Sequence, residues 1–186
     1  RSVPKPQAIL CISAHWETRG TGVTAMAQPR TIHDFYGFPR ELNEKQYPAS
    51  GSSELADMVK RTVSSVEVIE DHDWGLDHGS WSVLCRMYPD ASIPVVQLSL
   101  NRDLSLESHY RLGQELAPLR DEGILILGSG NMVHNLGMAT WVEAGFDWAI
   151  EYDIRLKEWI TAGEHGEVVH FECHGEPALL SVNSEE

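Results

Sequence analysis

The sequence predicts an α/β fold, a single domain in which a mainly parallel or mixed central sheet is flanked by helices. Short apolar runs of strand length recur along the chain, and amphipathic stretches of helical period lie between them. The chain has 186 residues, of which 42% are hydrophobic and 23% are charged, which is typical of one globular domain. Open sheets of this kind bind ligands at the carboxyl ends of their strands, so residues that follow the predicted strands are the first candidates for function.

Five segments have the length and composition of strands. Residues 7–13 form a continuous apolar run after two prolines, which is typical of a buried parallel strand. The further predicted strands are residues 21–26, 66–69, 93–100 and 124–127.

Three segments have the apolar spacing of amphipathic helices. The first follows N-cap residues at 50–53 and continues to Val63. The second covers residues 106–117 and is stopped by Asp121-Glu-Gly123. The third covers residues 146–160, with Gly163 as its stop signal.

Composition excludes several classes of partner. With 14 basic and 28 acidic residues the net charge is 14 − 28 = −14, so nucleic acid and anionic membrane surfaces are not expected partners. No apolar run approaches the roughly 20 residues of a membrane helix, and the N-terminal residues do not resemble a signal peptide. The three cysteines, Cys11, Cys85 and Cys173, form no CxxC, which favours a reducing cytoplasm. The sequence does not indicate an oligomeric state.

Four of the nine histidines lie where a functional site is expected. His15 follows the first predicted strand, and His134 follows the last one after a Gly-Ser-Gly-Asn loop. His78 lies in a loop after the strand at 66–69, and His33 lies in a loop rich in aromatic residues. Imidazoles that converge on one crevice would bind zinc or ferrous iron, or transfer protons near neutral pH.

Each of these histidines also has a structural interpretation. A lone histidine at a strand end is more often a loop residue bonded to the backbone, and Asp77 could orient His78 by a hydrogen bond in either case. The loop at Gly128 could hold a phosphate, but neither GxGxxG nor a Walker lysine accompanies it. Trp16, Trp74 and Trp81 are expected in the core or in pocket walls.

Two other patterns predict function less strongly. His170, Cys173 and His174 lie within five residues, but no second pair occurs at zinc-finger spacing, so a structural role is favoured over metal binding. The GxSxG pattern of serine hydrolases is missing.

Four motifs together resemble those of the class III extradiol ring-cleaving dioxygenases, most closely the 4,5-DOPA extradiol dioxygenase branch. They occur in that family's order and span most of the chain. The motifs are Ser13-Ala-His-Trp16, Thr31-Ile-His-Asp-Phe35 with Gly37-Phe-Pro39, Asp77-His-Gly-Ser-Trp81 and Gly128-Ser-Gly-Asn-Met-Val-His-Asn-Leu136.

The resemblance implies a role for each histidine. It implies that His15 is a metal ligand, and that His134 either binds the metal or acts as the acid/base beside it. His78 resembles the histidine that polarises a hydroxyl group of the substrate ring. The implied substrate pocket includes His33, Trp16 and Trp81.

The implied activity is metal-dependent opening of the aromatic ring of a DOPA-like catechol by O2. The implied cofactor is a divalent metal, Zn²⁺ or Fe²⁺, of which only iron supports redox chemistry. Two alternatives stay open: a non-catalytic metal-binding or partner-binding relative on the same fold, and, more weakly, a zinc hydrolase that uses His15. The sequence has no HExxH to support the hydrolase.

Two motifs of the family have no counterpart here, a His-Gly-Ser-Pro-like loop near its start and a Glu-His-Tyr-Leu-Pro-like segment towards its end. Both carry metal ligands in the family. The resemblance therefore implies that residues 1–186 are one catalytic domain without its N-terminal strand and C-terminal segment. We expect this stretch alone to bind metal weakly and to be inactive.

Overall fold

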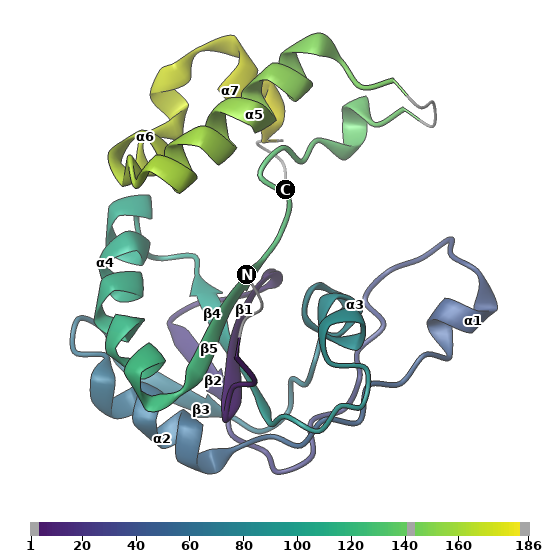
Figure 1. Cartoon of the computed structure of the whole chain (residues 1–186), viewed down its shortest axis with the longest axis vertical. Coiled ribbons are helices and arrows are strands. Elements are labelled where there is room, and N and C mark those ends of the chain that lie inside the picture. Colours follow the sequence, from purple (N-terminus) through teal and green to yellow (C-terminus); the bar gives the residue numbers. More distant parts are fainter. Residues whose placement is uncertain (1–3, 141–143, 183–186) are drawn as a thin grey trace. The chain divides into compact units, whose positions relative to one another are not determined.

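A five-stranded mixed sheet organises the first of two units into which the chain divides, residues 1–130 and residues 131–186 (Figure 1). The computed structural model describes residues 4–140 and 144–182. The strands are β1 (Ala8–Thr18), β2 (Thr21–Thr24), β3 (Val68–Asp71), β4 (Val95–Asn101) and β5 (Ile124–Ser129), in the order β3-β2-β4-β1-β5.

Strand β1 lies inside the sheet, paired in parallel with both β4 and β5. Strands β2 and β3 are also parallel, whereas β2 and β4 pair in antiparallel fashion through Val23 and Leu98. The sheet is therefore mainly parallel with one antiparallel junction, which confirms the predicted α/β class. It also brings the carboxyl ends of β1, β4 and β5 to one edge.

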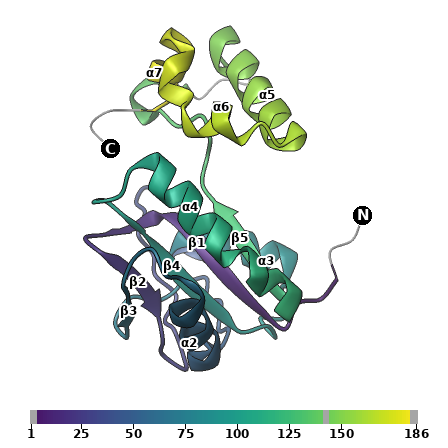
Figure 2. The same cartoon turned by 90° about the vertical axis from the view of Figure 1, so that its left-hand side faces the viewer.

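Helices cover both faces of this sheet (Figures 1 and 2). Leu10 of β1 packs in a cluster with residues of α2 (Ser53–Thr62) and α4 (Leu106–Leu116). Its neighbours Ile9 and Cys11 face the opposite way, into a cluster with residues of α3 (His78–Met87). Because successive strand residues point to opposite faces, this continuous apolar strand is buried on both sides.

Polar side chains begin the three longer helices of the first unit. The side chain of Ser52 accepts a hydrogen bond from the backbone N of Leu55 at the start of α2, as the sequence predicts. Ser105 caps α4 in the same way. A short 3-10 helix, η1 (Ala117–Glu122), continues α4 and ends at Gly123 with φ of +74°, a left-handed conformation that favours glycine. The short helix α1 (Arg40–Asn43) follows the loop that contains His33 and Phe35.

The start of α3 corrects the prediction that His78 lies in a loop. His78 is the first residue of α3, and the Asp77 side chain caps the helix by accepting a hydrogen bond from the backbone N of Ser80. Gly and Asp in this motif are typical of a loop, but Asp is also a favoured N-cap residue.

The carboxyl-terminal half of β1 departs from regular pairing. Its register with β4 shifts between Ile12 and Glu17, so His15 and Trp16 lie in an irregular stretch of the strand. Irregularities of this kind change the direction of side chains and are common next to functional sites. Trp16 is buried and stacks on Trp74, with ring centroids 5.7 Å apart.

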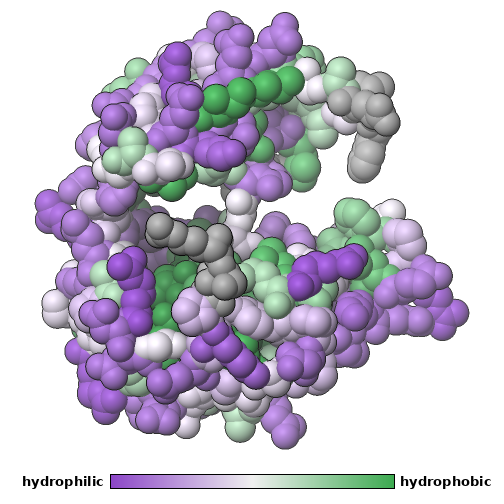
Figure 3. Space-filling view, viewed as in Figure 1, coloured by the Kyte–Doolittle hydropathy of each residue, from purple (hydrophilic) through white to green (hydrophobic). Residues whose placement is uncertain are grey.

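The second unit is helical in the part that the structure describes. Its elements are η2 (Leu136–Met138), α5 (Asp147–Ala162), α6 (His165–Val169), η3 (Phe171–His174) and α7 (Glu176–Ser181). Tyr152 and Leu156 of α5 pack on Ala178 of α7, and α5 ends at left-handed Gly163 as predicted. Ile150 and Ile154 of α5 are about half exposed, and Figure 3 shows apolar side chains at the surface over this helix.

Among the described residues, no helix combines the length and the apolar character needed to span a membrane. The predicted extent of one catalytic domain over residues 1–186 stays a prediction.

Candidate metal and active site

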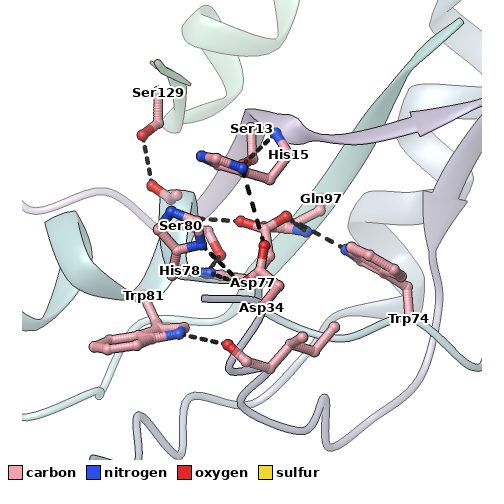
Figure 4. A network of polar contacts seen from close by, with 12 residues as sticks. Ser13, His15, Asp34, Trp74, Asp77, His78, Ser80, Trp81, Gln97 and Ser129 are labelled. Atoms are coloured by element: carbon pink, nitrogen blue, oxygen red, sulfur yellow. Dashed lines mark hydrogen bonds and ion pairs between the residues drawn. The ribbon is translucent and has the colours of Figure 1, made fainter. Parts of the chain in front are cut away.

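Three side chains from separate segments meet beside the end of β1 (Figure 4). His15 lies on β1, Asp34 on the loop that follows β2, and His78 at the start of α3. Their ligand atoms all lie within 4.8 Å of one another, and within residues 4–140 and 144–182 no other group of this kind occurs. The structure therefore brings two of the predicted site histidines together and adds a carboxylate to them.

The carboxylate of Asp34 makes the closest contacts of the group. Its Oδ1 accepts hydrogen bonds from the backbone N of His78 at 3.0 Å and from the ring Nδ1 of His78 at 2.8 Å. Its Oδ2 lies 4.0 Å from Nδ1 of His15. The two imidazole rings lie side by side, with centroids 3.9 Å apart and planes at 45°.

The contacts with His78 also change the acidity of Asp34. Partial burial alone would raise the pKa of this carboxyl, but the hydrogen bonds from the backbone and ring of His78 outweigh burial and lower the pKa below its usual 3.8. Asp34 therefore carries a negative charge near neutral pH. A negative charge beside two imidazoles favours a bound cation.

A second carboxylate, Asp77, fixes the backbone that carries His78. Asp77 is fully buried, and besides capping α3 it accepts a hydrogen bond from Nε2 of Gln97 on β4 at 3.0 Å. The start of α3 is thereby tied to the middle of the sheet. The carboxylate that bonds the His78 ring is Asp34, so the interpretation that Asp77 orients this histidine is wrong.

Gly79 allows α3 to approach β1 closely. A Cβ atom at this position would collide with Oγ of Ser13 and would lie 3.0 Å from Cδ2 of His15. Ser129 of β5 donates a hydrogen bond to the carbonyl of Gly79, which joins the helix start to a further strand. The glycine of the Asp77-His-Gly-Ser-Trp81 motif is needed to bring His78 beside His15.

Aromatic side chains also lie near His78. The ring of Phe35 meets the ring of His78 edge-on at 5.4 Å. His33 lies 5.6 Å from the ring of Trp81, and its Nε2 lies 2.8 Å from the carbonyl oxygen of Lys45. Trp81 is buried and donates from Nε1 to the carbonyl of Ile32.

The predicted pocket residues therefore occupy different positions. His33 lies in the aromatic group that surrounds His78, and Trp81 supports that group from the core. Trp16 is buried against Trp74. Their contact with substrate stays a prediction.

His134 belongs to the second unit. Its backbone N donates to the carbonyl of Ser181 at 2.7 Å, and it forms an isolated β-bridge with Val182. Within this unit it lines a cavity of about 320 Å³ whose wall includes Phe146 and Trp148. Its predicted role as metal ligand or acid/base stays a prediction.

In the cluster at residues 170–174, His174 makes contacts within its own unit, and the structural role favoured from the sequence stays a prediction. Nε2 of His174 lies 3.0 Å from the carbonyl oxygen of Glu167, and its ring centroid lies 4.3 Å from that of Trp159. Cys173 is exposed and free. These residues are outside the one group of potential metal ligands found in the described part of the chain.

The donor set at the end of β1 fits a divalent metal. Imidazole is a common ligand of zinc and of ferrous iron, and the carboxylate of Asp34 adds a negative charge that favours a bound cation. Sequence reasoning missed Asp34, although it lies in the quoted motif Thr31-Ile-His-Asp-Phe35. The histidine of that motif, His33, is the residue type more typical of such sites, whereas the structure places the adjacent aspartate against His78.

The chain is similar to known proteins over most of its length. Residues 2–176 match the family described as the catalytic LigB subunit of aromatic ring-opening dioxygenase. A 4,5-DOPA dioxygenase extradiol from Escherichia coli (strain K12) is 48% identical over 163 residues, which cover 86% of this chain and 60% of that protein. The protein of the same name from Beta vulgaris is 44% identical over 172 residues, covering 90% and 64%.

A solved structure supports the fold as well. The crystal structure of an uncharacterized protein from Escherichia coli K12 has a TM-score of 0.77 and 40% sequence identity, and the match covers 96% of this chain and 70% of that one. The chain spans 60% and 64% of the length of the two curated relatives. The match over residues 2–176, together with the structural likeness, shows that this chain belongs to the LigB family of catalytic subunits of aromatic ring-opening dioxygenases.

Proposed function

We propose that the protein is an extradiol dioxygenase that opens the aromatic ring of a DOPA-like catechol with O2. The observation that carries this proposal is the His15, Asp34 and His78 group in a chain of this family. The named relatives, which are 4,5-DOPA dioxygenases, support a catechol as the substrate. Small aromatic molecules and O2 are therefore the proposed partners.

His15 is the proposed metal ligand of this group. Its side chain is 38% exposed, so a metal and a substrate can reach it. The metal is Zn²⁺ or Fe²⁺; ferrous iron supplies the redox chemistry for O2 and lowers the pKa of a coordinated hydroxyl, whereas zinc has no redox chemistry. For His134, the motif resemblance supports a role as ligand or as acid/base.

His78 is the proposed acid/base on the substrate side. Because Asp34 bonds Nδ1 at 2.8 Å, proton exchange with a catechol hydroxyl falls to Nε2. His78 would take the phenolic proton and return it later in the reaction. Phe35, edge-on to the ring of His78, would limit the access of water, and His33, Trp16 and Trp81 complete the proposed pocket.

A reducing, cytoplasmic location is part of the proposal. Cys11, Cys85 and Cys173 are all free thiols, as expected in a reducing compartment. The net charge of −14 gives no support for a nucleic-acid or anionic membrane partner.

The test is a ring-opening assay on the full-length protein. The protein is loaded with Fe(II) without oxygen, DOPA is added, and oxygen is then admitted while the yellow ring-opened product is followed. We expect product with iron, none with zinc, and none from His78→Ala, whereas His72→Ala, an exposed histidine outside the group, stays active. Iron-loaded protein without product would overturn the proposal, and zinc-dependent cleavage of an ester or amide would favour the hydrolase.

A second measurement assigns His134. If His134 is an acid/base, His134→Ala keeps its metal and its substrate affinity while kcat falls by about 10²–10⁴-fold. If His134 is a ligand, elemental analysis finds the variant depleted of metal. A variant with full metal content and an unchanged turnover number would exclude both roles.

A further inference from the structure

We propose that Asp34 is the positioning residue of His78: its carboxylate holds the imidazole in the tautomer that carries its proton on Nδ1 and leaves Nε2 unprotonated. The inference rests on the proposed role of His78 as acid/base. It assigns to Asp34 a task that is separate from metal binding.

The hydrogen bonds of Asp34 specify both the orientation and the tautomer of the ring. One oxygen, Oδ1, accepts from the backbone N of His78 at 3.0 Å and from ring Nδ1 at 2.8 Å. An ionised carboxylate can only accept hydrogen bonds, so Nδ1 must be the donor. Two bonds from one residue to the same atom hold the ring in one rotamer, and a carboxylate at one ring nitrogen sets the function of the other.

The loop that carries Asp34 is fixed against the segment that carries His78. The backbone N of Ile32 donates to the carbonyl of Leu76 at 2.7 Å, and Nε1 of Trp81 donates to the carbonyl of Ile32 at 2.8 Å. These two contacts lie on either side of His78 in the sequence. The carboxylate is therefore held relative to the imidazole by the backbone on both sides.

The same contacts argue against Asp34 as a metal ligand. Its Oδ1 already accepts two hydrogen bonds, and coordination of a metal through Nδ1 of His78 would require the 2.8 Å bond to break. The remaining oxygen, Oδ2, faces Nδ1 of His15 at 4.0 Å. Asp34 thus lies beside the Nδ1 atoms of both histidines, and its bond to Nδ1 of His78 leaves the exchange of a proton with the substrate to Nε2 of that ring.

The first test reads the tautomer directly, without turnover. Full-length metal-free protein labelled with ¹⁵N-histidine is measured by long-range ¹H–¹⁵N correlation, and the His78 signals are assigned by their loss in His78→Gln. We expect His78 to carry its proton on Nδ1, and we expect Asp34→Ala and Asp34→Asn to populate the other tautomer. A proton on Nε2 in the unmodified protein would overturn the proposal without any variant.

The second test separates positioning from metal binding and from folding. In the iron-loaded protein, Asp34→Asn should lower kcat by about 10-fold and Asp34→Ala by about 100-fold, with KM and metal content within about 2-fold of the unmodified protein. Asp34→Glu, which keeps the charge, should recover part of kcat. The matched control is Asp73→Asn, an exposed aspartate outside the group.

The outcomes are distinguishable. Loss of metal from Asp34→Asn would make Asp34 a ligand, and a lower thermal stability with an unchanged tautomer would make it structural; either result overturns the proposal. If the unmodified protein opens no catechol ring, the proposed function fails, but the tautomer measurement still decides what Asp34 does.

Discussion

Residue types that can bind metal gather in two places in the described part of the chain, and these two groups differ in how their members are distributed along the sequence. His15, Asp34 and His78 come from three separate segments, yet their ligand atoms lie within 4.8 Å of one another. His170 and His174 lie within five residues that also include Cys173, yet they are not part of such a group. Convergence in space, rather than density in the sequence, distinguishes the candidate site.

The fold explains this difference. Parallel pairing of β1 with β4 and β5 brings the carboxyl ends of the strands to one edge, where loops from distant parts of the chain meet. In the second group, the short helix η3 includes His174, whose ring packs against Trp159. That imidazole contributes to the core of its own unit instead of facing a ligand.

The largest expected effect is the loss of metal binding when His15 is replaced. The same replacement at His174, in the second group, provides the comparison. His15→Ala should weaken metal binding by more than about 100-fold, because loss of a ligand exceeds the 10–100-fold effect of losing a residue that only supports one. His174→Ala should leave metal binding unchanged. Elemental analysis of the full-length variants after dialysis gives the comparison. Normal metal content in His15→Ala would contradict the assignment of this ligand.

Much of the fold of the first unit, and part of the candidate site, could be predicted from the sequence. The apolar runs predicted the five strands, because burial on both faces leaves a continuous apolar pattern, and the helical spacing predicted α2 and α4 but not α1 or α3. His15 and His78 were predicted because they lie in motifs near strand ends. For residues 170–174 the favoured structural role stays a prediction, although the ring of His174 does pack against Trp159.

Other features have no local signature in the sequence. Asp34 lies in an irregular loop, and its carboxylate is placed beside His78 by contacts between segments far apart in the chain, such as the hydrogen bond from Ile32 to Leu76. The antiparallel junction of β2 with β4 is likewise a long-range pairing. The helical position of His78 did have a signal, since Asp77 is a favoured N-cap residue.

Asp77 holds the start of α3 in place, and it can be replaced without changing His15, Asp34 or His78. Asp77→Ala should lower the free energy of unfolding by about 2–3 kcal/mol, because Nε2 of Gln97 loses its buried partner and α3 loses its cap. Urea unfolding measures the change, and Asp73→Ala is the exposed control. Equal stability of the two variants would mean that Asp77 does not hold α3 to the sheet.

The close approach of α3 to β1 is tested by adding one methyl group. Gly79→Ala should lower the free energy of unfolding by about 1–2 kcal/mol, because the new Cβ meets Ser13 and His15 in a packed region. We also expect weaker metal binding, since the helix must move away from His15. Gly113→Ala, on α4 with no atom within 4 Å of the added carbon, is the matched control. A Gly79→Ala protein as stable as this control would show that the contact is not tight.

The smallest expected effect concerns the second group, where packing is the only role we assign to His174. His174→Ala removes the ring contact with Trp159 and the hydrogen bond to the carbonyl of Glu167, so it should destabilise the second unit by about 1 kcal/mol. Faster hydrogen exchange should then be confined to α5, α6 and α7, while the sheet amides keep their protection. The exposed His165 provides the matched control, His165→Ala. Faster hydrogen exchange of the amides in β1 or β4 would contradict this assignment, because it would show that His174 also stabilises the sheet on which His15 lies.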